Sequence, residues 1–262
     1  MKARFLLIGL VVLFVGGMLA NSAHAAIDPK TIVGLWLFDE GSGNIATDTS
    51  GNKNNGNFTG SPKWVAGKFG KALQLDGSSA SVDCGNTASL DIPTNNAVTM
   101  VAWVNSAVGS LASWQGLMAK RSGNYSYGIN FVTGNFQVYS SSASGVQGWG
   151  YNLPKGEWTH LVGIMSKSPT ELYVNGELNG GAGKGPGGGA LSNTANLFRI
   201  GASGSIGEYF NGIVDDVAVF NVALSAADIK NIFSKGLAVA TGKAAVESSG
   251  KLATSWASLK SQ

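Results

Sequence analysis

Two adjacent acids, Asp215 and Asp216, stand inside an otherwise apolar segment that runs from Gly212 to Phe220. A carboxylate within an apolar strand costs free energy unless it is paired, hydrogen-bonded or bound to a cation. The segment is therefore expected to provide a ligand for a cation. Successive side chains of a strand point to opposite faces, so the two acids are not expected to serve the same ion.

A turn-rich stretch offers further oxygen donors. Asp48, Asn52 and Asn54 occur among Gly and Ser residues that favour tight turns. Such side chains, together with backbone carbonyls and water, can supply the six to eight oxygens that Ca²⁺ takes. Asp48 could equally accept hydrogen bonds from its own turn, as Asp residues in turns usually do. The pattern leaves both interpretations open.

The remaining acids do not form pairs suited to hydrolysis. Glycoside hydrolysis normally uses two carboxyl groups that converge on one bond. Glu171 and Glu177 flank the hairpin dipeptide Asn175-Gly176 and are expected to point to opposite faces. The neighbours Asp39 and Glu40 are separated by the same alternation. The sequence therefore predicts a protein that is not an enzyme.

Aromatic residues near turns are candidates for binding a glycan or a protein surface, because sugars stack on aromatic faces. Trp149 and Tyr151 are two residues apart and share a face if the chain is extended there. Trp114 and Tyr125 lie beside Gly- or Ser-rich turns, as do Tyr127 and Tyr209. The alternative is that these aromatic residues only cover the edge of the core.

The N-terminus indicates export. Residues 1–25 combine a positive start with an uncharged apolar run and end at Ala23-His24-Ala25, which is typical of a cleaved signal peptide. The protein is therefore expected to be extracellular or periplasmic, with no membrane association after cleavage. The full chain carries a formal charge of +3, of which Lys2 and Arg4 contribute +2, so +1 remains after cleavage. This charge gives no indication of nucleic-acid binding.

Short apolar or alternating segments between turns predict an all-β fold. The expected strands are residues 33–38, 72–77, 81–84, 98–104, 117–120, 125–132, 135–140, 158–164, 171–174, 197–201 and 212–220. Residues 39–60 contain mainly turn formers. One helix is expected, with Ser225 as its N-cap and Gly236 at its end. We therefore expect one domain over residues 26–236, followed by an Ala-, Ser- and Lys-rich tail over residues 237–262.

The ordered series of these segments resembles the laminin-G-like domains of the concanavalin A-like lectin/glucanase superfamily, which are common in secreted bacterial proteins. The resemblance runs from Val33 to Phe233, and no single motif in it is diagnostic. The matching segments are residues 34–43, 48–51, 54–56, 69–77, 99–104, 156–160, 172–176, 200–201 and 210–229.

This resemblance implies a two-sheet antiparallel jelly-roll β-sandwich with one short C-terminal helix, in which the first and last strands pair. Many relatives bind one Ca²⁺ near that pairing. The resemblance favours Asp215 as a calcium ligand, with Asp48 and the carbonyls or amides around Asn52 and Asn54 opposite it. Many relatives also bind glycans or proteins, and some proteins of the same fold are glycoside hydrolases.

Three hypotheses for the function follow. The first is a secreted, non-catalytic recognition module that binds carbohydrate and is stabilised by Ca²⁺. The second is a structural or adhesive module that binds proteins at the cell envelope. The third is a glycoside hydrolase of the same fold whose site the sequence does not reveal.

Overall fold

The computed structural model describes residues 27–92, 97–108, 114–122, 124–132, 135–140, 147–149, 151–165, 170–179, 195–204 and 208–243. The signal peptide predicted at residues 1–25 lies outside these residues, as does the predicted tail beyond residue 243. In the described part of the chain, no helix is long and apolar enough to cross a membrane.

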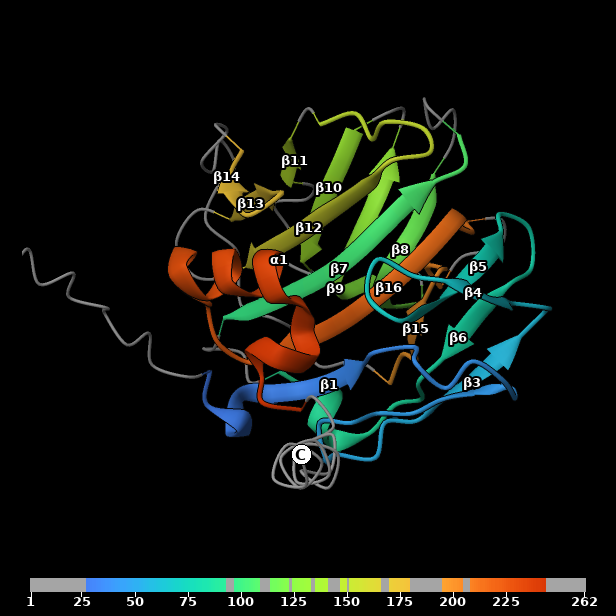
Figure 1. Ribbon diagram of the computed structural model, residues 1–262, viewed down its shortest axis with the longest axis horizontal. Helices are drawn as coiled ribbons and strands as arrows, with labels where there is room; N and C mark the ends of the chain where they lie inside the picture. The colour runs from blue at the N-terminus through green and yellow to red at the C-terminus, as the bar shows by residue number, and fades with distance from the viewer. Residues whose placement is uncertain are drawn as a thin grey trace, which may run out of the picture.

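In the described residues, sixteen strands form two eight-stranded antiparallel sheets (Figure 1). The first sheet has the order β14 (Glu177–Leu178), β13 (Glu171–Val174), β12 (Trp158–Met165), β7 (Val98–Ser106), β16 (Asn211–Phe220), β5 (Lys71–Asp76) and β4 (Lys63–Ala66), and β1 (Ile32–Trp36) also pairs with β16. The second sheet has the order β11 (Gln147–Trp149), β10 (Asn135–Ser140), β9 (Asn124–Val132), β8 (Gln115–Ser122), β15 (Phe198–Ile200), β6 (Ser81–Asp83), β3 (Gly56–Thr59) and β2 (Ile45–Ala46).

This arrangement confirms the predicted β-sandwich, including the antiparallel pairing of the first and last strands, in which Trp36 faces Val217. The first sheet turns alternate side chains inward, among them Val104 and Val214, which are fully buried. The second sheet contributes Val82 and Ile200 to the same core. Burial of these two apolar faces between the sheets is the main source of stability.

The helix α1 (Ala226–Ala240) covers the outer face of the first sheet (Figure 1). It begins at a capping box in which Ser225 and Asp228 bond each other's backbone N–H groups. Ile229 and Ile232 pack against Leu35 and Phe220 in a second apolar cluster. Two 3₁₀ turns, at Pro29–Thr31 and Ala88–Leu90, complete the elements.

The helix is interrupted at Gly236, where φ is 77°, which is close to the end predicted from the sequence. Packing nevertheless continues beyond the predicted domain boundary at residue 236. Leu237 is fully buried and Ala240 is 6% exposed, both in the cluster beneath the helix. The first residues of the predicted tail are therefore part of the domain.

An aromatic group lies between α1 and the first sheet. The rings of Trp103 and His160 are 5.1 Å apart, and Phe233 of the helix stacks on Trp103 at 5.5 Å. Both ring nitrogens of His160 are buried and have no hydrogen-bond partner among the residues that the structure describes. Burial lowers the pKa of His160 from 6.5 to about 3, so the ring is neutral in the folded protein near pH 7.

We expect acid to destabilise the protein through His160, the only histidine after residue 25. Because its folded-state pKa is depressed, the unfolded state binds more protons below about pH 6.5, and stability falls as the pH decreases. Between about pH 7.5 and about pH 4.5 the free energy of unfolding of the wild type should fall by about 2.7 kcal/mol more than that of His160→Phe. This difference corresponds to the roughly two pH units between the unfolded-state pKa and about pH 4.5.

Urea unfolding of both proteins at the two pH values measures this difference. Asp215 and Asp216 have raised pKa values and titrate with the opposite sign in this range, but both proteins contain them. Lys68, whose Nζ lies 4.7 Å from the Trp103 ring centroid, is likewise present in both. An equal loss of stability in the two proteins would contradict the assignment to His160.

Candidate functional site

A pocket of about 290 Å³ opens on the outer face of the second sheet. Its lining residues are Thr59, Ser81, Arg199, Ala202, Ser203, Gly204 and Tyr209. Val82 and Ile200 point into the core, so the flanking Ser81 and Arg199 point away from it. The pocket therefore lies on the side of the sheet that faces away from the sandwich interior.

Short side chains form one side of the pocket, and a returning loop forms the other. Thr59 of β3 and Ser81 of β6 face each other across the strand pair and contribute hydroxyl groups. The chain after β15 folds back over β8, where the Gly116 N–H donates to the Glu208 carbonyl at 3.1 Å. A Cβ at Gly116 would lie 2.0 Å from the backbone nitrogen of Ser203, so this close approach requires glycine.

An ion pair fixes the returning loop. Arg121 of β8 donates to Glu208 at 2.6 Å and to the Ser203 hydroxyl at 3.2 Å. Burial raises the pKa of Glu208, whereas the neighbouring Arg121 lowers it. Because Ser203 and Tyr209 lie on this loop, the ion pair also determines where the wall of the pocket stands.

Arg199 is the charged residue in the pocket lining. Its nearest ion-pair partner is Asp83, with a distance of 3.8 Å between Nε and Oδ2. Asp83 Oδ1 accepts the backbone N–H of Gly85 at 2.9 Å. The side chains of Arg199 and Asp83 are 31% and 27% exposed. Hydroxyls, a guanidinium and an aromatic ring can together hydrogen-bond and stack on a small polar ligand.

The described lining of the pocket does not include the four aromatic residues predicted as ligand contacts. Trp114 is 40% exposed and precedes β8, whereas Tyr151 is half-buried and packs against the core. Tyr125 belongs to β9 and Trp149 to β11, and their side chains lie outside the described residues. The aromatic ring in the pocket lining is that of Tyr209, which the sequence marked only by its position beside a Gly-rich turn.

The predicted calcium ligands of residues 48–54 form a clamp on β1. Asp48 Oδ1 accepts the N–H groups of Leu35 at 3.0 Å and Ser50 at 2.9 Å, and Oδ2 accepts that of Asn54 at 2.8 Å. The amide groups of Asn52 and Asn54 donate to the Val33 carbonyl. The carboxylate of Asp48 therefore holds its own turn and the first strand, as the alternative interpretation expected.

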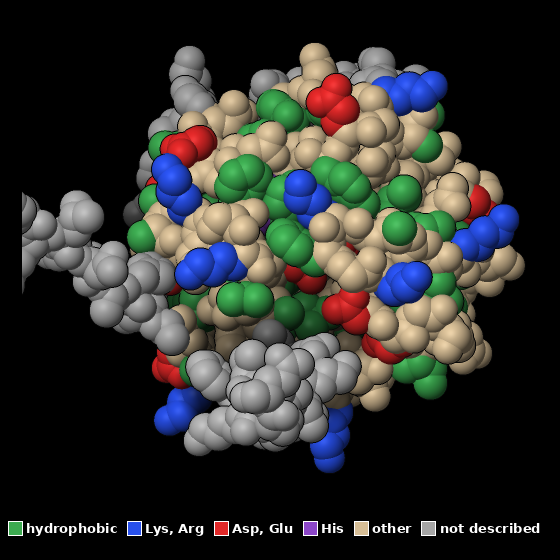
Figure 2. Space-filling model, in the orientation of Figure 1, with side chains coloured by type: hydrophobic (Ala, Val, Ile, Leu, Met, Phe, Trp, Pro, Cys, Tyr) green, Lys and Arg blue, Asp and Glu red, His purple; other side chains and the backbone are tan. Residues whose placement is uncertain are grey.

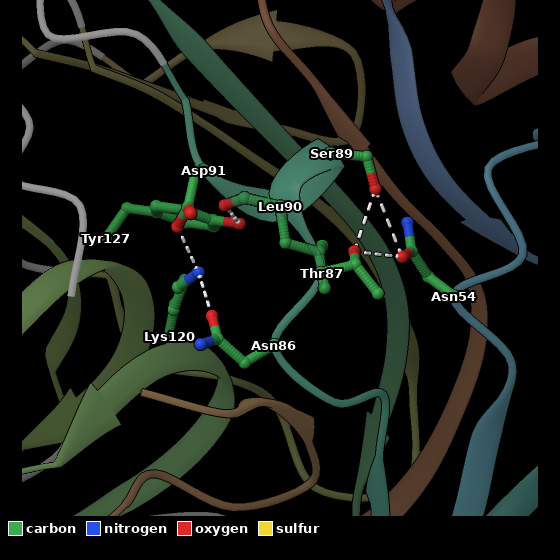
Figure 3. A network of polar contacts seen from close by, with 8 residues as sticks. All are labelled: Asn54, Asn86, Thr87, Ser89, Leu90, Asp91, Lys120 and Tyr127. Carbon is green, nitrogen blue, oxygen red and sulfur yellow. Dashed lines mark hydrogen bonds and ion pairs between the residues drawn. The ribbon is translucent and has the colours of Figure 1, made fainter. Parts of the chain in front are cut away.

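The clamp continues into a polar network at the end of the sandwich (Figure 3). Asn54 Oδ1 accepts hydrogen bonds from the hydroxyls of Thr87 and Ser89. Asp91, which lies in the same segment as Thr87 and Ser89, pairs with the fully buried Lys120 of β8. Lys120 also donates to Asn86 Oδ1 at 2.6 Å. These contacts fasten residues 86–91 to both the Asp48 turn and the second sheet.

Asp215 and Asp216 do not alternate as the sequence predicted. The register of β16 against β7 shifts between Asp215 and Ala218, and Asp216 has a φ of 44°. This β-bulge adds one residue to the strand, so both acids point to the outer face. Asp215 accepts the N–H of Phe69 at 2.9 Å and Asp216 that of Leu237 at 2.7 Å.

Both acids of the bulge are closed off from solvent, at 0% and 2% exposure. Burial, together with a neighbouring carboxylate in each case, raises the pKa of Asp215 to about 8 and that of Asp216 to about 7, although their backbone hydrogen bonds act in the opposite direction. The loop between β4 and β5 and the helix α1 cover this part of the first sheet (Figure 1). Figure 2 shows the same face, on which Lys and Arg side chains are scattered among hydrophobic and other side chains. The pair therefore has no open groove in which a sugar could reach it.

The proposed calcium ligands fit the ion only in part. Their oxygens are of the right chemical type, but those of Asp48 and Asn54 already accept hydrogen bonds from the protein. The described residues contain no group of three or more His, Cys, Asp or Glu side chains suited to a metal ion. The set of Asp48, Asn52, Asn54 and Asp215 stays a prediction.

Thermal unfolding tests that prediction. If Ca²⁺ binds only the folded protein, a hundredfold excess over Kd should add about 2.7 kcal/mol of stability relative to chelator. Asp215→Asn should remove the response, whereas Asp76→Asn, which changes an exposed acid at the end of β5, should preserve it. Asp216 cannot serve as the control because the bulge places it beside Asp215. Identical melting with Ca²⁺ and with chelator would remove the calcium proposal.

Comparison with solved structures finds a similar fold in several proteins. Domain 4 of AbnA, an extracellular arabinanase from Geobacillus stearothermophilus solved with arabinotriose, is 20% identical, with a TM-score of 0.59, and the match covers 77% of this chain and 98% of that one. The binding domain of botulinum neurotoxin DC, solved with rat synaptotagmin II, is 14% identical, with a TM-score of 0.62. The match covers 79% of this chain and 52% of that one.

Trypanosoma rangeli sialidase in complex with sialic acid is 17% identical, with a TM-score of 0.58, and the match covers 80% of this chain and 33% of the sialidase. At these identities the likeness shows the fold alone.

Comparison with curated protein sequences finds no match. A family model described as the concanavalin A-like lectin/glucanases superfamily, of the laminin G type, matches residues 76–230, which is more than half of the chain. The chain therefore belongs to the concanavalin A-like lectin/glucanases superfamily.

Proposed function

We propose that this protein is a secreted, non-catalytic recognition module that binds carbohydrate in the pocket on the outer face of the second sheet. The observation that carries the proposal is the pocket itself, where Tyr209 and Arg199 stand beside the hydroxyls of Thr59 and Ser81. An aromatic ring with a few convergent polar groups is the usual composition of a small-ligand site. The arabinotriose complex of a structurally similar domain supports a sugar as the ligand.

Two other functions have support from particular observations. The neurotoxin binding domain in complex with synaptotagmin supports recognition of a protein, for which the exposed Trp114 is a candidate contact. A hydrolase is favoured by the sialidase, whose length this chain covers to 33%, and by the arabinanase to which the similar domain 4 belongs. The two acids of the bulge are buried beneath the helix side of the first sheet, which is the opposite side from the pocket.

Glycan binding by three variants tests the proposal. In a screen of immobilised polysaccharides, Tyr209→Ala should weaken binding about tenfold, because a stacked ring contributes about 1.5 kcal/mol. Leu178→Thr changes a 44% exposed residue on β14, at the edge of the other sheet, and should bind as the wild type does. Trp114→Ala should also leave binding unchanged.

The outcomes separate the candidate functions. If only Trp114→Ala weakens binding, the sugar site lies before β8 and not in the pocket. If no polysaccharide binds the wild type while extracellular proteins do, the protein-binding function is the correct one. Release of sugar from any bound polysaccharide would contradict the non-catalytic role.

A further inference from the structure

The charged groups around the pocket differ in how far their hydrogen-bonding capacity is used. Arg121 and Glu208 are committed to each other at 2.6 Å, and Arg121 also donates to Ser203. This pair holds the loop, and the pocket lining includes neither of its two side chains. The charged side chain in the lining is that of Arg199, so Arg199 is the group available to select what the pocket binds.

Arg199 is the group with unused capacity. A guanidinium has five N–H donors. In the described part of the chain, the side chain of Arg199 makes no hydrogen bond, and its ion pair with Asp83 is long at 3.8 Å. Asp83, by contrast, already accepts the Gly85 N–H. The unsatisfied groups that face the pocket are thus mainly donors, and they call for a ligand rich in acceptors.

A carboxylate matches these donors best. Its two oxygens accept two parallel N–H bonds from one guanidinium, and such charge-assisted pairs are about twice as strong as neutral hydrogen bonds. Arg199 is well placed for this because it is only 31% exposed, so screening by water is reduced. Ala119, its partner on β8, has a short side chain that leaves the guanidinium room above the sheet.

The volume of the pocket limits the size of the ligand. At about 290 Å³ it lies at the lower end of small-molecule sites, which span about 300–1,000 Å³. The returning loop closes it along Ser203 and Tyr209. This space suits one sugar ring and not several consecutive ones.

We propose that the pocket holds a single sugar residue that carries a carboxylate, a uronic or similar acid, and that Arg199 binds this group through two hydrogen bonds. The inference rests on the proposed function of the same pocket and narrows it to acidic sugars. Tyr209 provides the ring face for the sugar, and the hydroxyls of Thr59 and Ser81 bind its remaining polar groups. Asp83 holds Arg199 loosely in place and competes with the ligand for it.

Matched probes test the inference without a known natural ligand. Methyl glucuronide, methyl glucoside and methyl glucuronamide share one ring and differ only at the carboxyl position. Ligand-observed NMR titration should show the glucuronide binding about tenfold more tightly than the other two, since a hydrogen bond to a charged group contributes about 1.5–3 kcal/mol. Added salt should weaken only the glucuronide.

Variants then assign the effect to the proposed residues. Arg199→Gln should lose the preference for the glucuronide, and Arg199→Lys should retain part of it because a lysine keeps the charge without the planar fork. Asp83→Asn should strengthen glucuronide binding severalfold, since it removes the competing anion but keeps an oxygen for the Gly85 N–H. Melting temperatures close to that of the wild type show that the variants are folded.

Each possible outcome supports or overturns the inference that the pocket binds an acidic sugar. Binding of neutral sugars in the pocket without any preference for the glucuronide overturns the inference and leaves the proposed function standing. Binding of no glycan at all overturns both. A preference for the glucuronide that persists in Arg199→Gln shows that another residue recognises the acid, which also overturns the inference.

Discussion

Replacing Asp48 with Ala is expected to lower the free energy of unfolding by about 3 kcal/mol or more. Its carboxylate is 7% exposed and accepts three backbone N–H groups, those of Leu35, Ser50 and Asn54. The N–H groups of Leu35 and Asn54 belong to buried residues, so they would be left without a partner and largely without water. A buried donor that loses its acceptor costs about 1–3 kcal/mol.

Asp76 provides the matched control. It also accepts three backbone N–H groups, from Ser78, Ser79 and Ala80, and these hold its pKa well below the ordinary value. Asp76 is exposed, however, so water can replace the lost acceptor, and Asp76→Ala should cost about 1 kcal/mol.

Urea unfolding in the presence of chelator compares the two variants without any contribution from a cation. A much larger loss for Asp48→Ala would support its role as the clamp between the turn and the first strand. Equal losses would mean that burial of the carboxylate does not matter. A loss for Asp48→Ala that appears only with Ca²⁺ present would instead favour the calcium interpretation.

The fold could be predicted because its main strands carry the pattern that packing requires. Residues 98–104 are apolar on both faces, and the structure buries one face between the sheets and covers the other with α1. The helix start was readable for a similar reason, since the Ser225 cap and its Asp228 partner are local. The short strands β2 and β3 were missed because they lie in a turn-rich stretch and are only two and four residues long, which is too short to show an alternating pattern.

The candidate site was harder to predict because its parts come from distant positions. Arg199 and Tyr209 approach Thr59 and Ser81 only through strand pairing, which a single sequence does not reveal. The bulge in β16 was missed for another reason. Strict alternation placed Asp215 and Asp216 on opposite faces, but one residue with positive φ was enough to bring both to the same face.

Lys120 was expected to be an ordinary strand residue, yet its side chain is fully buried between the sheets. Its ammonium group pairs with Asp91, whose side chain is 34% exposed, and donates to Asn86 (Figure 3). The two ends of this pair therefore differ in their access to water. A buried charge depends on its partner far more than a partly hydrated charge does.

Removing the partly exposed Asp91 should consequently destabilise the protein more than removing the buried Lys120. Asp91→Ala is expected to cost about 3–5 kcal/mol, because the ammonium of Lys120 is left buried with only Asn86 as a partner. Lys120→Met should cost about 1 kcal/mol, since the chain keeps its volume and the Asp91 carboxylate regains water. The double variant should be about as stable as Lys120→Met, so adding the second change to Asp91→Ala should restore most of the lost stability. Urea unfolding of the four proteins in a double-mutant cycle measures this coupling. If the two single losses simply add, Lys120 does not depend on Asp91, and the network does not hold residues 86–91 in the way that the structure indicates.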